Sequence, residues 1–411
     1  MKIAMFSDCY LDLTGGIVTV MKAQKEALEK LGHTVYIFTT GYPRTREEIK
    51  RLAKKNIYVV PSCKFLIRKV TPVSRRPRVV ERWILREHPE VRDFDIFYIH
   101  YEAGCSIAGC RLGRMLGIPV VQVMHGREDM GETNIMPPGL RTIVAWGLNT
   151  MHGWYLPHTR KVRKDDYLAD TRAKAKMWTL VVNHANAADY VITPAEHYLM
   201  KLKHYGVMRN ARVIKNAVAD ESFPTPGKVR EWRKNEPLRM IWHSRVSGEK
   251  RIMALLEALR KVEGEYVLDV YGGGPDLVKA KLYAQTYHLR QVKFHGDTKF
   301  EELKEKLGEA HLDMLVSYNY DVCPMTLLEA QAMGTPVFIC DRDMAGLVPD
   351  GGYELAAGPT AEEIAAALNK LYSHRERIHE MSRAMTNHRE EALQSRRINE
   401  LVKMFEEIRK A

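Results

Sequence analysis

Short apolar runs of β-strand length alternate with amphipathic stretches of helix length along most of this 411-residue chain. In the first half the predicted strands are "KIAMFSD", "TVYIFTT", "IYVVPS", "IFYIH", "VVQVMH" and "YVITPA". Residues 17–32, between two of them, place apolar side chains at helical spacing and end in a glycine, which predicts a helix. Because strands with near-continuous apolar runs are buried on both faces, the alternation predicts an α/β fold of parallel sheets covered by helices.

The strand–helix pattern begins again after a polar, proline-bearing stretch at 216–239. The second half contributes the predicted strands "RMIWHSR", "YVLDVYGGG", "VKFHGD", "DMLVS" and "TPVFIC". A chain of this length also exceeds one ordinary hydrophobic core. We therefore expect two doubly wound, Rossmann-like domains, at 1–220 and 221–388, followed by a charged amphipathic helix in 389–411. We expect that helix to pack back on one of the two domains, and of these we choose the N-terminal domain.

Charge and cysteine usage limit the classes of partner and compartment. The chain has 63 Lys and Arg against 51 Asp and Glu, a net charge of +12, which favours an anionic partner such as nucleic acid, a membrane surface or a phosphorylated substrate. Simple solubility explains the same excess. Six scattered cysteines without a CxxC pair argue against a zinc site or disulfide framework and for a reducing, cytoplasmic setting. No apolar run approaches the roughly 20 residues that span a bilayer.

The interval 126–187 does not follow the strand–helix alternation. It mixes large aromatic side chains with basic ones: Trp146, Trp154, Tyr155, Tyr167 and Trp178 lie among Arg160, Lys161, Arg163, Lys164, Arg172, Lys174 and Lys176. Such a mixture suits a membrane interface, where cations meet anionic headgroups and indole rings sit at the boundary. An ordinary excursion with a solvated charged face and buried tryptophans is the alternative.

Three glycine-bearing or basic loops follow predicted strands. Gly15 and Gly16 come just after the first strand, at the start of a helix, where free N–H groups favour a phosphate. Arg245 and Lys250 follow the first strand of the second domain and could neutralise a diphosphate in the crevice where such folds bind ligands. Gly273 is the middle residue of "YGGGPDL", one unit later. Each loop taken alone is also explained as an ordinary turn.

Two carboxylates eight residues apart flank a predicted helix start. Asp321 precedes the helix and Glu329 lies one turn after Met325. A carboxylate accepts hydrogen bonds from adjacent hydroxyls of a sugar or a ribose, and the backbone N–H groups of Met325 and Thr326 at the helix start suit a phosphate. One strand–loop–helix unit therefore suits sugar, diphosphate and ribose in a row, although either acid alone fits a solvated or helix-capping role.

In this order, the motifs resemble those of retaining glycosyltransferases of family 4, which have the GT-B fold of two Rossmann-like domains facing a cleft. The motifs are the glycine loop, Arg-x4-Lys, Gly-x-Gly-Pro and a carboxylate-x7-Glu. The resemblance covers essentially the whole chain. It implies a nucleotide-sugar donor held mainly by the C-terminal domain and an acceptor on the N-terminal domain.

The resemblance also implies residue roles. Arg245 and Lys250 bind the donor diphosphate and stabilise the leaving group. Glu329 accepts hydrogen bonds from the ribose hydroxyls, and Asp321 takes the place of the usual glutamate that contacts the transferred sugar. Gly16 approaches the diphosphate from the other domain.

His125, which ends the strand "VVQVMH", matches the family's histidine near the anomeric carbon, although a histidine ending a buried strand has a structural explanation too. The chain departs from the family pattern at three places. Asp321 is one methylene shorter than glutamate, Ser244 stands where the family often has glycine, and Pro324 removes one backbone donor near the sugar.

Three N-terminal segments resemble the enzymes that glucosylate diacylglycerol in Gram-positive bacteria: residues 7–40, 99–121 and "HGREDM". This narrower resemblance implies UDP-glucose as donor, a membrane glycerolipid as acceptor, and a cytoplasmic protein bound peripherally to the anionic inner face of the membrane. We expect no cofactor beyond the donor and no metal. Asp93–Asp95 and Asp341–Asp343 match a DxD metal pattern by letter but lie away from the donor motifs, so we interpret both as structural.

Retaining transfer without a protein nucleophile is the mechanism expected, with double displacement through Asp321 as the alternative. Three other functions stay open. The same fold could glycosylate a polysaccharide or soluble acceptor, it could be a UDP-sugar epimerase, or the basic charge could serve nucleic-acid binding. The last is disfavoured because no recognition helix or RNA-binding motif is present.

Overall fold

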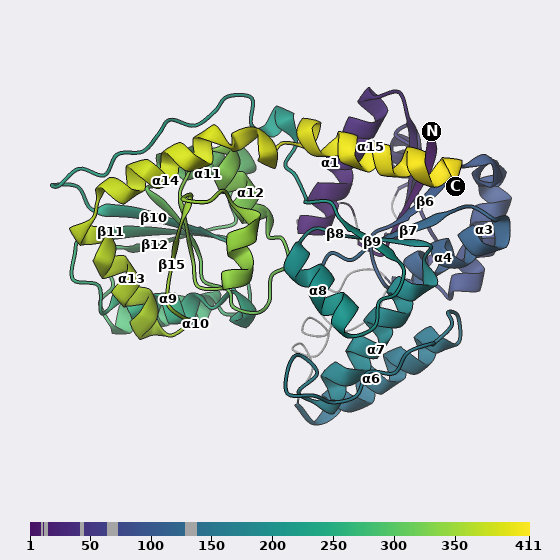
Figure 1. Ribbon diagram of the computed structural model, residues 1–411, viewed down its shortest axis with the longest axis horizontal. Helices are drawn as coiled ribbons and strands as arrows, with labels where there is room; N and C mark the ends of the chain where they lie inside the picture. Colours follow the sequence, from purple (N-terminus) through teal and green to yellow (C-terminus); the bar gives the residue numbers. More distant parts are fainter. Residues whose placement is uncertain (10, 12–14, 42–44, 64–72, 128–137) are drawn as a thin grey trace. The chain divides into compact units, whose positions relative to one another are not determined.

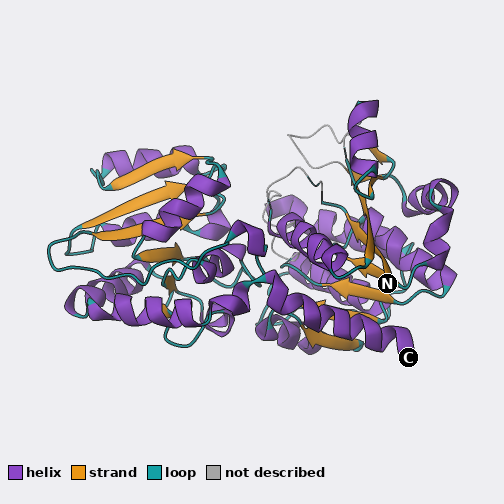
Figure 2. Ribbon diagram, turned by 90° about the horizontal axis from the view of Figure 1, so that it is seen from above, coloured by secondary structure: helices purple, strands orange, loops and turns teal. Residues whose placement is uncertain are grey.

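The computed structural model describes residues 1–9, 11, 15–41, 45–63, 73–127 and 138–411. These residues form two compact units, one of Met1–Lys215 with Ile398–Ala411 and one of Asn216–Arg397. Each unit is a parallel β-sheet with helices on its faces (Figures 1 and 2). The chain passes from the first unit to the second after Lys215, whereas the sequence placed the boundary after residue 220.

The first unit contains a seven-stranded sheet in the order β3-β2-β1-β6-β7-β8-β9, with every neighbouring pair parallel. Its strands are β1 (Lys2–Ser7), β2 (Thr34–Thr39), β3 (Ile57–Val59), β6 (Ile96–Ile99), β7 (Val120–Val123), β8 (Tyr190–Thr193) and β9 (Asn210–Val213). A separate antiparallel ribbon joins β4 (Ser62–Cys63) to β5 (Val73–Ser74). The central strands β1, β6 and β7 are buried apart from Lys2 at the start of β1, as their apolar runs predict.

Helices cover both faces of this sheet. They are α1 (Gly16–Lys30), α2 (Arg46–Ala53), α3 (Pro77–Glu87), α4 (Gly104–Leu116), α6 (Pro138–Gly153), α7 (Arg172–Ala187) and α8 (Glu196–His204), with the 3₁₀ turn η1 (Pro89–Asp93). The last helix, α15 (Gln394–Lys410), belongs largely to this unit, because Ile398, Leu401 and Phe405 pack into the core that also contains Ile3 and Met21.

The second unit contains a six-stranded parallel sheet in the order β12-β11-β10-β13-β14-β15. Its strands are β10 (Leu238–His243), β11 (Tyr266–Tyr271), β12 (Val292–Gly296), β13 (Leu312–Leu315), β14 (Val337–Ile339) and β15 (Tyr353–Leu355). Its helices are α9 (Ile252–Leu259), α10 (Leu277–Thr286), α11 (Phe300–Glu309), α12 (Met325–Ala332), α13 (Ala361–Ser373) and α14 (Glu376–Asn387), with the 3₁₀ turns η2 (Asp220–Ser222), η3 (Gly248–Lys250), η4 (Arg342–Leu347) and η5 (Arg389–Ala392).

Both sheets reverse their strand order once. In the first unit the chain runs outward from β1 to β3 and then from β6 to β9 on the other side, and in the second it runs from β10 to β12 and then from β13 to β15. Ligands of open α/β sheets bind beyond the carboxyl ends of the strands at such a reversal. A ligand site is therefore expected at the loops after β10 and β13 in the second unit, and at those after β1 and β6 in the first.

Candidate functional site

The reversal in the second unit brings together Lys250 and Asp321, which are 71 residues apart in sequence. Lys250 Nζ lies 2.6 Å from Asp321 Oδ1, and both side chains are largely buried. Ser317, which follows β13, donates to the other carboxylate oxygen of Asp321 at 2.5 Å. The ammonium also lies 5.5 Å from the ring centre of Tyr320. The predicted phosphate-binding cation and the predicted sugar-binding acid thus form one cluster at this point.

Arg245 lies in the same loop as Lys250 but points its guanidinium outward, with 64% of the side chain exposed. It donates to Glu249 Oε1 at 2.5 Å and to Ser247 Oγ at 3.3 Å. Ser247 in turn donates to Glu249, so the loop after β10 is fixed by side-chain hydrogen bonds of its own. Nε and the terminal Nη2 of the guanidinium are engaged by the loop, and its exposed remainder is available to a ligand phosphate.

Helix α12 begins at Met325 without a side-chain cap. Pro324 is the N-cap residue rather than the first helical residue, so its missing N–H removes no helical hydrogen bond. The hydroxyl oxygen of Thr326, in the first turn, is buried and, within the part of the chain that the structure describes, has no hydrogen-bond partner. An unpartnered buried hydroxyl is costly, and uncapped N–H groups at a helix start favour an anion. The predicted contribution of Met325 and Thr326 to phosphate binding fits this geometry.

Glu329 is held by a histidine that the sequence did not single out. His243, the last residue of β10, places Nδ1 3.5 Å from Glu329 Oε2 and Nε2 3.3 Å from Asp313 Oδ2 on β13. The His243 and Asp313 side chains are almost completely buried. The three residues come from β10, β13 and α12, which meet only in the folded sheet, so spacing along the chain gave no signal.

Burial and the neighbouring charges have opposite effects on the pKa values of His243 and Glu329. Burial alone disfavours a charged imidazole, but Asp313 and then Glu329 outweigh it and raise the pKa of His243. Burial raises the pKa of Glu329, and Asp313 adds to this rise, while His243 acts in the opposite direction. His243 therefore favours the charged form of Glu329 and, at 3.5 Å, orients its carboxylate.

The glycines of "YGGG" bring the loop after β11 against the loop after β10. A Cβ on Gly272, whose φ is +115°, would lie 2.2 Å from the carbonyl oxygen of Ser244. Val246 donates its N–H to the carbonyl of Gly273 at 2.9 Å. Gly273, the predicted ligand contact, stands beside the Asp297 carboxylate. These glycines therefore position the Arg245 loop by close backbone packing.

In the first unit, Gly15 and Gly16 lie where the glycine loop was predicted. Gly15 is the N-cap of α1, Gly16 its first residue, and both are exposed. Of the residues that the structure describes, none caps the helix with its side chain and none lies within 4 Å of the Gly15 Cβ position. The start of α1 can therefore be approached closely by an anionic group.

His125 follows β7 and is paired with a second histidine, His100, at the end of β6. The distance from His100 Nδ1 to His125 Nε2 is 2.9 Å, and the rings stack with their centres 5.2 Å apart. Burial lowers the pKa of His125 to about 3, so the imidazole is neutral at pH 7. His100 is fully buried, and its Nε2 has no hydrogen-bond partner among the described residues. The sequence did not single out this second histidine at the first unit's reversal.

The two DxD-like pairs are engaged by the protein itself. Asp341 caps η4 by accepting from the N–H of Asp343 and also accepts from the N–H of Asn319 at 2.6 Å. Asp95 accepts from the N–H of Lys2 at 2.7 Å. Asp95 and Asp341 thus both have structural partners, and the pair Asp93–Asp95 lies in the first unit, whereas Lys250 and Asp321 lie in the second.

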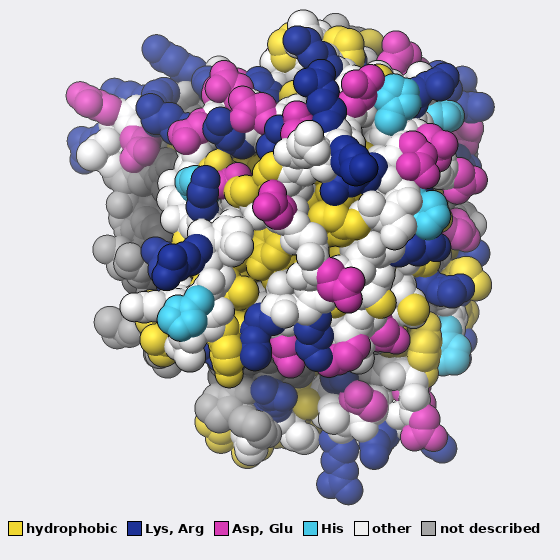
Figure 3. Space-filling model, turned by 90° about the vertical axis from the view of Figure 1, so that its left-hand side faces the viewer, with side chains coloured by type: hydrophobic (Ala, Val, Ile, Leu, Met, Phe, Trp, Pro, Cys, Tyr) yellow, Lys and Arg dark blue, Asp and Glu magenta, His cyan; other side chains and the backbone are white. Residues whose placement is uncertain are grey.

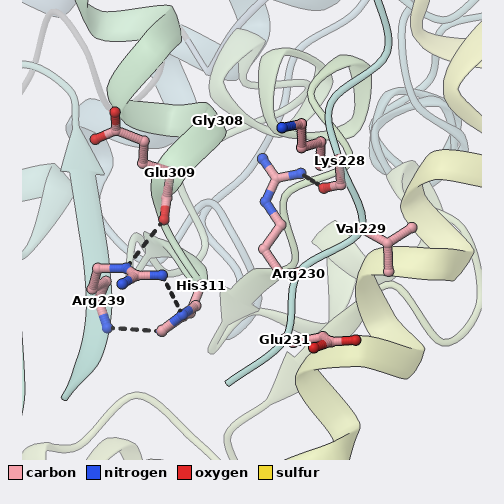
Figure 4. A pocket seen from close by; sticks show the side chains of 8 residues that line it. All are labelled: Lys228, Val229, Arg230, Glu231, Arg239, Gly308, Glu309 and His311. Atoms are coloured by element: carbon pink, nitrogen blue, oxygen red, sulfur yellow. Dashed lines mark hydrogen bonds between the residues drawn. The ribbon is translucent and has the colours of Figure 1, made fainter. Parts of the chain in front are cut away.

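A hollow of about 390 Å³ lies at the amino ends of β10 and β13, on the edge of the sheet opposite the cluster (Figure 4). Arg230 lines it but is buried, and its guanidinium donates to the carbonyls of Met333 and Leu307 and to the hydroxyl of Thr335. Arg239 and His311 are hydrogen-bonded to each other at 2.8 Å. These groups satisfy one another and fix the segment entering the second unit, so we assign the hollow a structural role.

Comparison with known proteins places these features in a family. Residues 14–222 match the family model described as Glycosyltransferase Family 4, and residues 228–388 match the model described as Glycosyl transferases group 1. The alpha-monoglucosyldiacylglycerol synthase of Streptococcus pneumoniae is 26% identical over 405 residues, which cover 93% of this chain and 82% of that protein.

Solved structures share the fold at low sequence identity. Anabaena HepE, solved in complex with UDP, superposes with a TM-score of 0.67 at 14% identity and covers 98% of this chain and 99% of its own. The sucrose-phosphate synthase of Thermosynechococcus elongatus has a TM-score of 0.70 at 14% identity and covers 99% and 98%. The two Rossmann-like units expected from the sequence are thereby confirmed as the GT-B fold.

Proposed function

This chain belongs to glycosyltransferase family 4, and on that premise we propose that it transfers a glucosyl unit from UDP-glucose to a diacylglycerol acceptor. Membership makes it a hexosyltransferase that uses a nucleotide sugar, and a retaining outcome is consistent with the family. The observation that carries the choice of acceptor is the near full-length similarity to a monoglucosyldiacylglycerol synthase. UDP as the nucleotide is supported by the UDP complex of HepE.

The donor half of the proposal rests on the cluster at the reversal in the second unit. Glu329, held by His243, accepts hydrogen bonds from the ribose hydroxyls. The exposed Arg245 and the start of α12, with the unpartnered Thr326 hydroxyl, bind the diphosphate. Lys250, paired with Asp321 at 2.6 Å, supplies a second cation to the diphosphate, and Asp321 contacts the transferred sugar in the proposal.

In the proposed reaction the bond between the anomeric carbon and the UDP oxygen breaks, and the acceptor oxygen bonds to that carbon on the same face. The departing diphosphate takes the electron pair and accepts the hydroxyl proton of the acceptor. Arg245, Lys250 and the N–H groups at the start of α12 stabilise the charge that develops on the diphosphate, the kind of interaction that dominates such catalysis. No metal is assigned a step.

The acceptor assignment implies work at a membrane, and we propose the inner face of the cell membrane as its place. In the described ranges, no helix is both long and apolar enough to cross a bilayer, so contact with lipid would be made from the surface.

A panel of nucleotide sugars, with and without diacylglycerol in vesicles, tests the proposal in buffer containing EDTA. We expect UDP-glucose and diacylglycerol together to give a glucosyl-diacylglycerol, identified by mass spectrometry, and no isomerised UDP-sugar without acceptor. Arg245→Ala should lower kcat by roughly 10²–10³-fold, and Arg290→Ala, which removes an exposed arginine elsewhere in the second unit, should not. Transfer only to soluble acceptors, epimerisation, a metal requirement, or an Arg245→Ala variant near wild type would each contradict the corresponding part.

A further inference from the structure

Arg251 follows Lys250 in the loop after β10 and has a left-handed backbone, with φ +59° and ψ +31°. It ends the turn η3 and is the N-cap residue of α9, where its carbonyl accepts from the N–H of Ala254 at 3.0 Å. Residues with a side chain rarely adopt this conformation, whereas glycine adopts it without steric strain. The turn alone therefore favours glycine, and a strained residue persists only where surrounding contacts hold it.

The guanidinium of Arg251 supplies such contacts, because it reaches two carbonyl groups from different parts of the second unit. Nη1 donates to the carbonyl oxygen of Val316 at 3.3 Å, and Nη2 donates to that of Pro359 at 2.5 Å. Val316 directly follows β13, and Pro359 lies shortly before α13. Cys340, at the end of β14, also donates to the Val316 carbonyl, at 3.2 Å. One planar group thereby ties the loops after β10 and β13 to the segment that enters α13.

These contacts differ from those of an ordinary surface arginine. Figure 3 shows basic and acidic side chains interspersed on the face of the second unit that it views, so cations there have acids nearby. Arg377, for example, lies 2.8 Å from Glu354. Among the described residues no carboxylate lies within 4 Å of the Arg251 guanidinium, whose recorded partners are the two carbonyls and the sulfur of Cys340. The charge of Arg251 therefore serves to hold backbone.

The backbone that Arg251 holds belongs to both halves of the ionic pair at the candidate site. Arg251 is the next residue after Lys250 along the chain. The carbonyl of Val316, which it binds, is one residue before Ser317, and Ser317 donates to Asp321 at 2.5 Å. Lys250 and Asp321 close this ring of contacts at 2.6 Å. A shift of either loop away from the other would therefore stretch the hydrogen bond from Arg251 to Val316.

We propose that Arg251 is a positioning residue for the transfer, which sets the distance between Lys250 and Asp321 by fixing the loop after β13 against the loop after β10. The inference rests on the proposed function, in which Lys250 binds the donor diphosphate and Asp321 contacts the sugar. Arg251 itself touches neither donor nor acceptor and acts through the two loops. A cation stabilises a departing diphosphate only when it is correctly placed, and a displacement of about 1 Å costs about 10²-fold.

Kinetics of Arg251→Gly test the proposal, because glycine removes the guanidinium and keeps the left-handed turn without strain. We expect kcat to fall about 10²-fold, while calorimetry shows UDP affinity close to that of wild type, since Arg245, Glu329 and the start of α12 still bind UDP. Guanidinium ion at millimolar concentration should restore part of the lost kcat, and sodium chloride at the same ionic strength should not. Arg251→Lys keeps the charge but not the planar fork, so its loss of kcat should be intermediate.

Arg230→Lys is the matched control. Arg230 also donates to carbonyl groups of the second unit, those of Met333 and Leu307, but at the opposite edge of the sheet. We expect this variant to lower the urea midpoint and to leave kcat unchanged. If Arg251→Gly does not fold, Arg251→Lys carries the test. A wild-type kcat in both Arg251 variants, an equal loss of kcat in Arg230→Lys, or no recovery with guanidinium ion would each overturn the proposal.

Reductive methylation of the full chain separates this inference from the proposed function, because the labelling needs no acceptor. The side chain of Lys250 is 15% exposed and paired with Asp321, so it should react slowly in wild type and faster in Arg251→Gly. The exposed Lys279 and Lys281 should react alike in both proteins, as measured by mass spectrometry of peptides. Unchanged labelling of Lys250 would reject the positioning role even if transfer is observed. Absence of any transfer by wild type would reject the proposed function, whereas faster labelling in the variant would still support the positioning role.

Discussion

Replacement of Gly272 by alanine should damage the donor site from a position that makes no ligand contact in the proposal. The new Cβ would lie 2.2 Å from the Ser244 carbonyl oxygen, at a backbone φ of +115° that side-chain-bearing residues rarely adopt. The strained backbone costs roughly 1–3 kcal/mol and the overpacking roughly as much again, against a gain of about 0.4–1 kcal/mol from a stiffer unfolded chain. We therefore expect Gly272→Ala to lower the free energy of unfolding of the second unit by roughly 2–5 kcal/mol.

The same substitution should also lower catalysis, because the contact can be relieved only if the loop that carries Arg245 moves by about 1 Å. A displacement of that size at a reacting centre costs about 10²-fold, and we expect a loss of that order in kcat/KM. Gly273→Ala is the matched control for unfolding alone, since Gly273 is itself a predicted ligand contact: its Cβ would lie 3.2 Å from the movable carboxylate of Asp297, at an ordinary φ. Urea unfolding and steady-state kinetics measure both quantities. Equal unfolding midpoints for the two variants, or a fully active Gly272→Ala enzyme, would refute the packing argument.

Two further predictions follow from buried histidines. His243→Asn should weaken UDP binding roughly tenfold or more, because a charge-assisted partner of Glu329 is lost, and calorimetry should show a smaller penalty for 2′-deoxy-UDP than in wild type; an unchanged penalty would contradict the positioning role. Burial lowers the pKa of His184 to about 3, against about 6.5 in an unfolded chain, so its stabilising effect is complete above pH 6.5 and declines by about 1.4 kcal/mol per unit as the pH falls. Urea unfolding between pH 7 and pH 5 should accordingly show a shallower loss of stability in His184→Asn, and identical slopes would contradict it.

The sheets could be predicted from the sequence where their strands are buried on both faces. Central strands such as β1 and β10 carry apolar runs that admit few alternatives, and they were found within a residue or two. The edge strands β9 (Asn210–Val213) and β15 (Tyr353–Leu355) were missed. They are only four and three residues long, and each alternates partly with solvent, so neither gives the run that identifies a central strand.

The residues of the candidate site were likewise predictable only in part. Lys250 and Asp321 could be proposed from motif order, although nothing in the sequence said that their side chains pair. His243 and Asp313 could not, because their relation to Glu329 exists only where β10, β13 and α12 meet in the folded sheet.

The two units offer different chemistry to a substrate, and this bears on where the proton goes in the proposed reaction. The cluster of the second unit is ionic, built from Lys250, Asp321 and the charged partners of His243. The histidine pair of the first unit is neutral, since burial lowers the pKa of His125 to about 3. A base so weak at pH 7 is poorly matched to accept a hydroxyl proton, whereas it remains able to hydrogen-bond a sugar hydroxyl. In the proposed reaction the departing phosphate is therefore a better proton acceptor than His125.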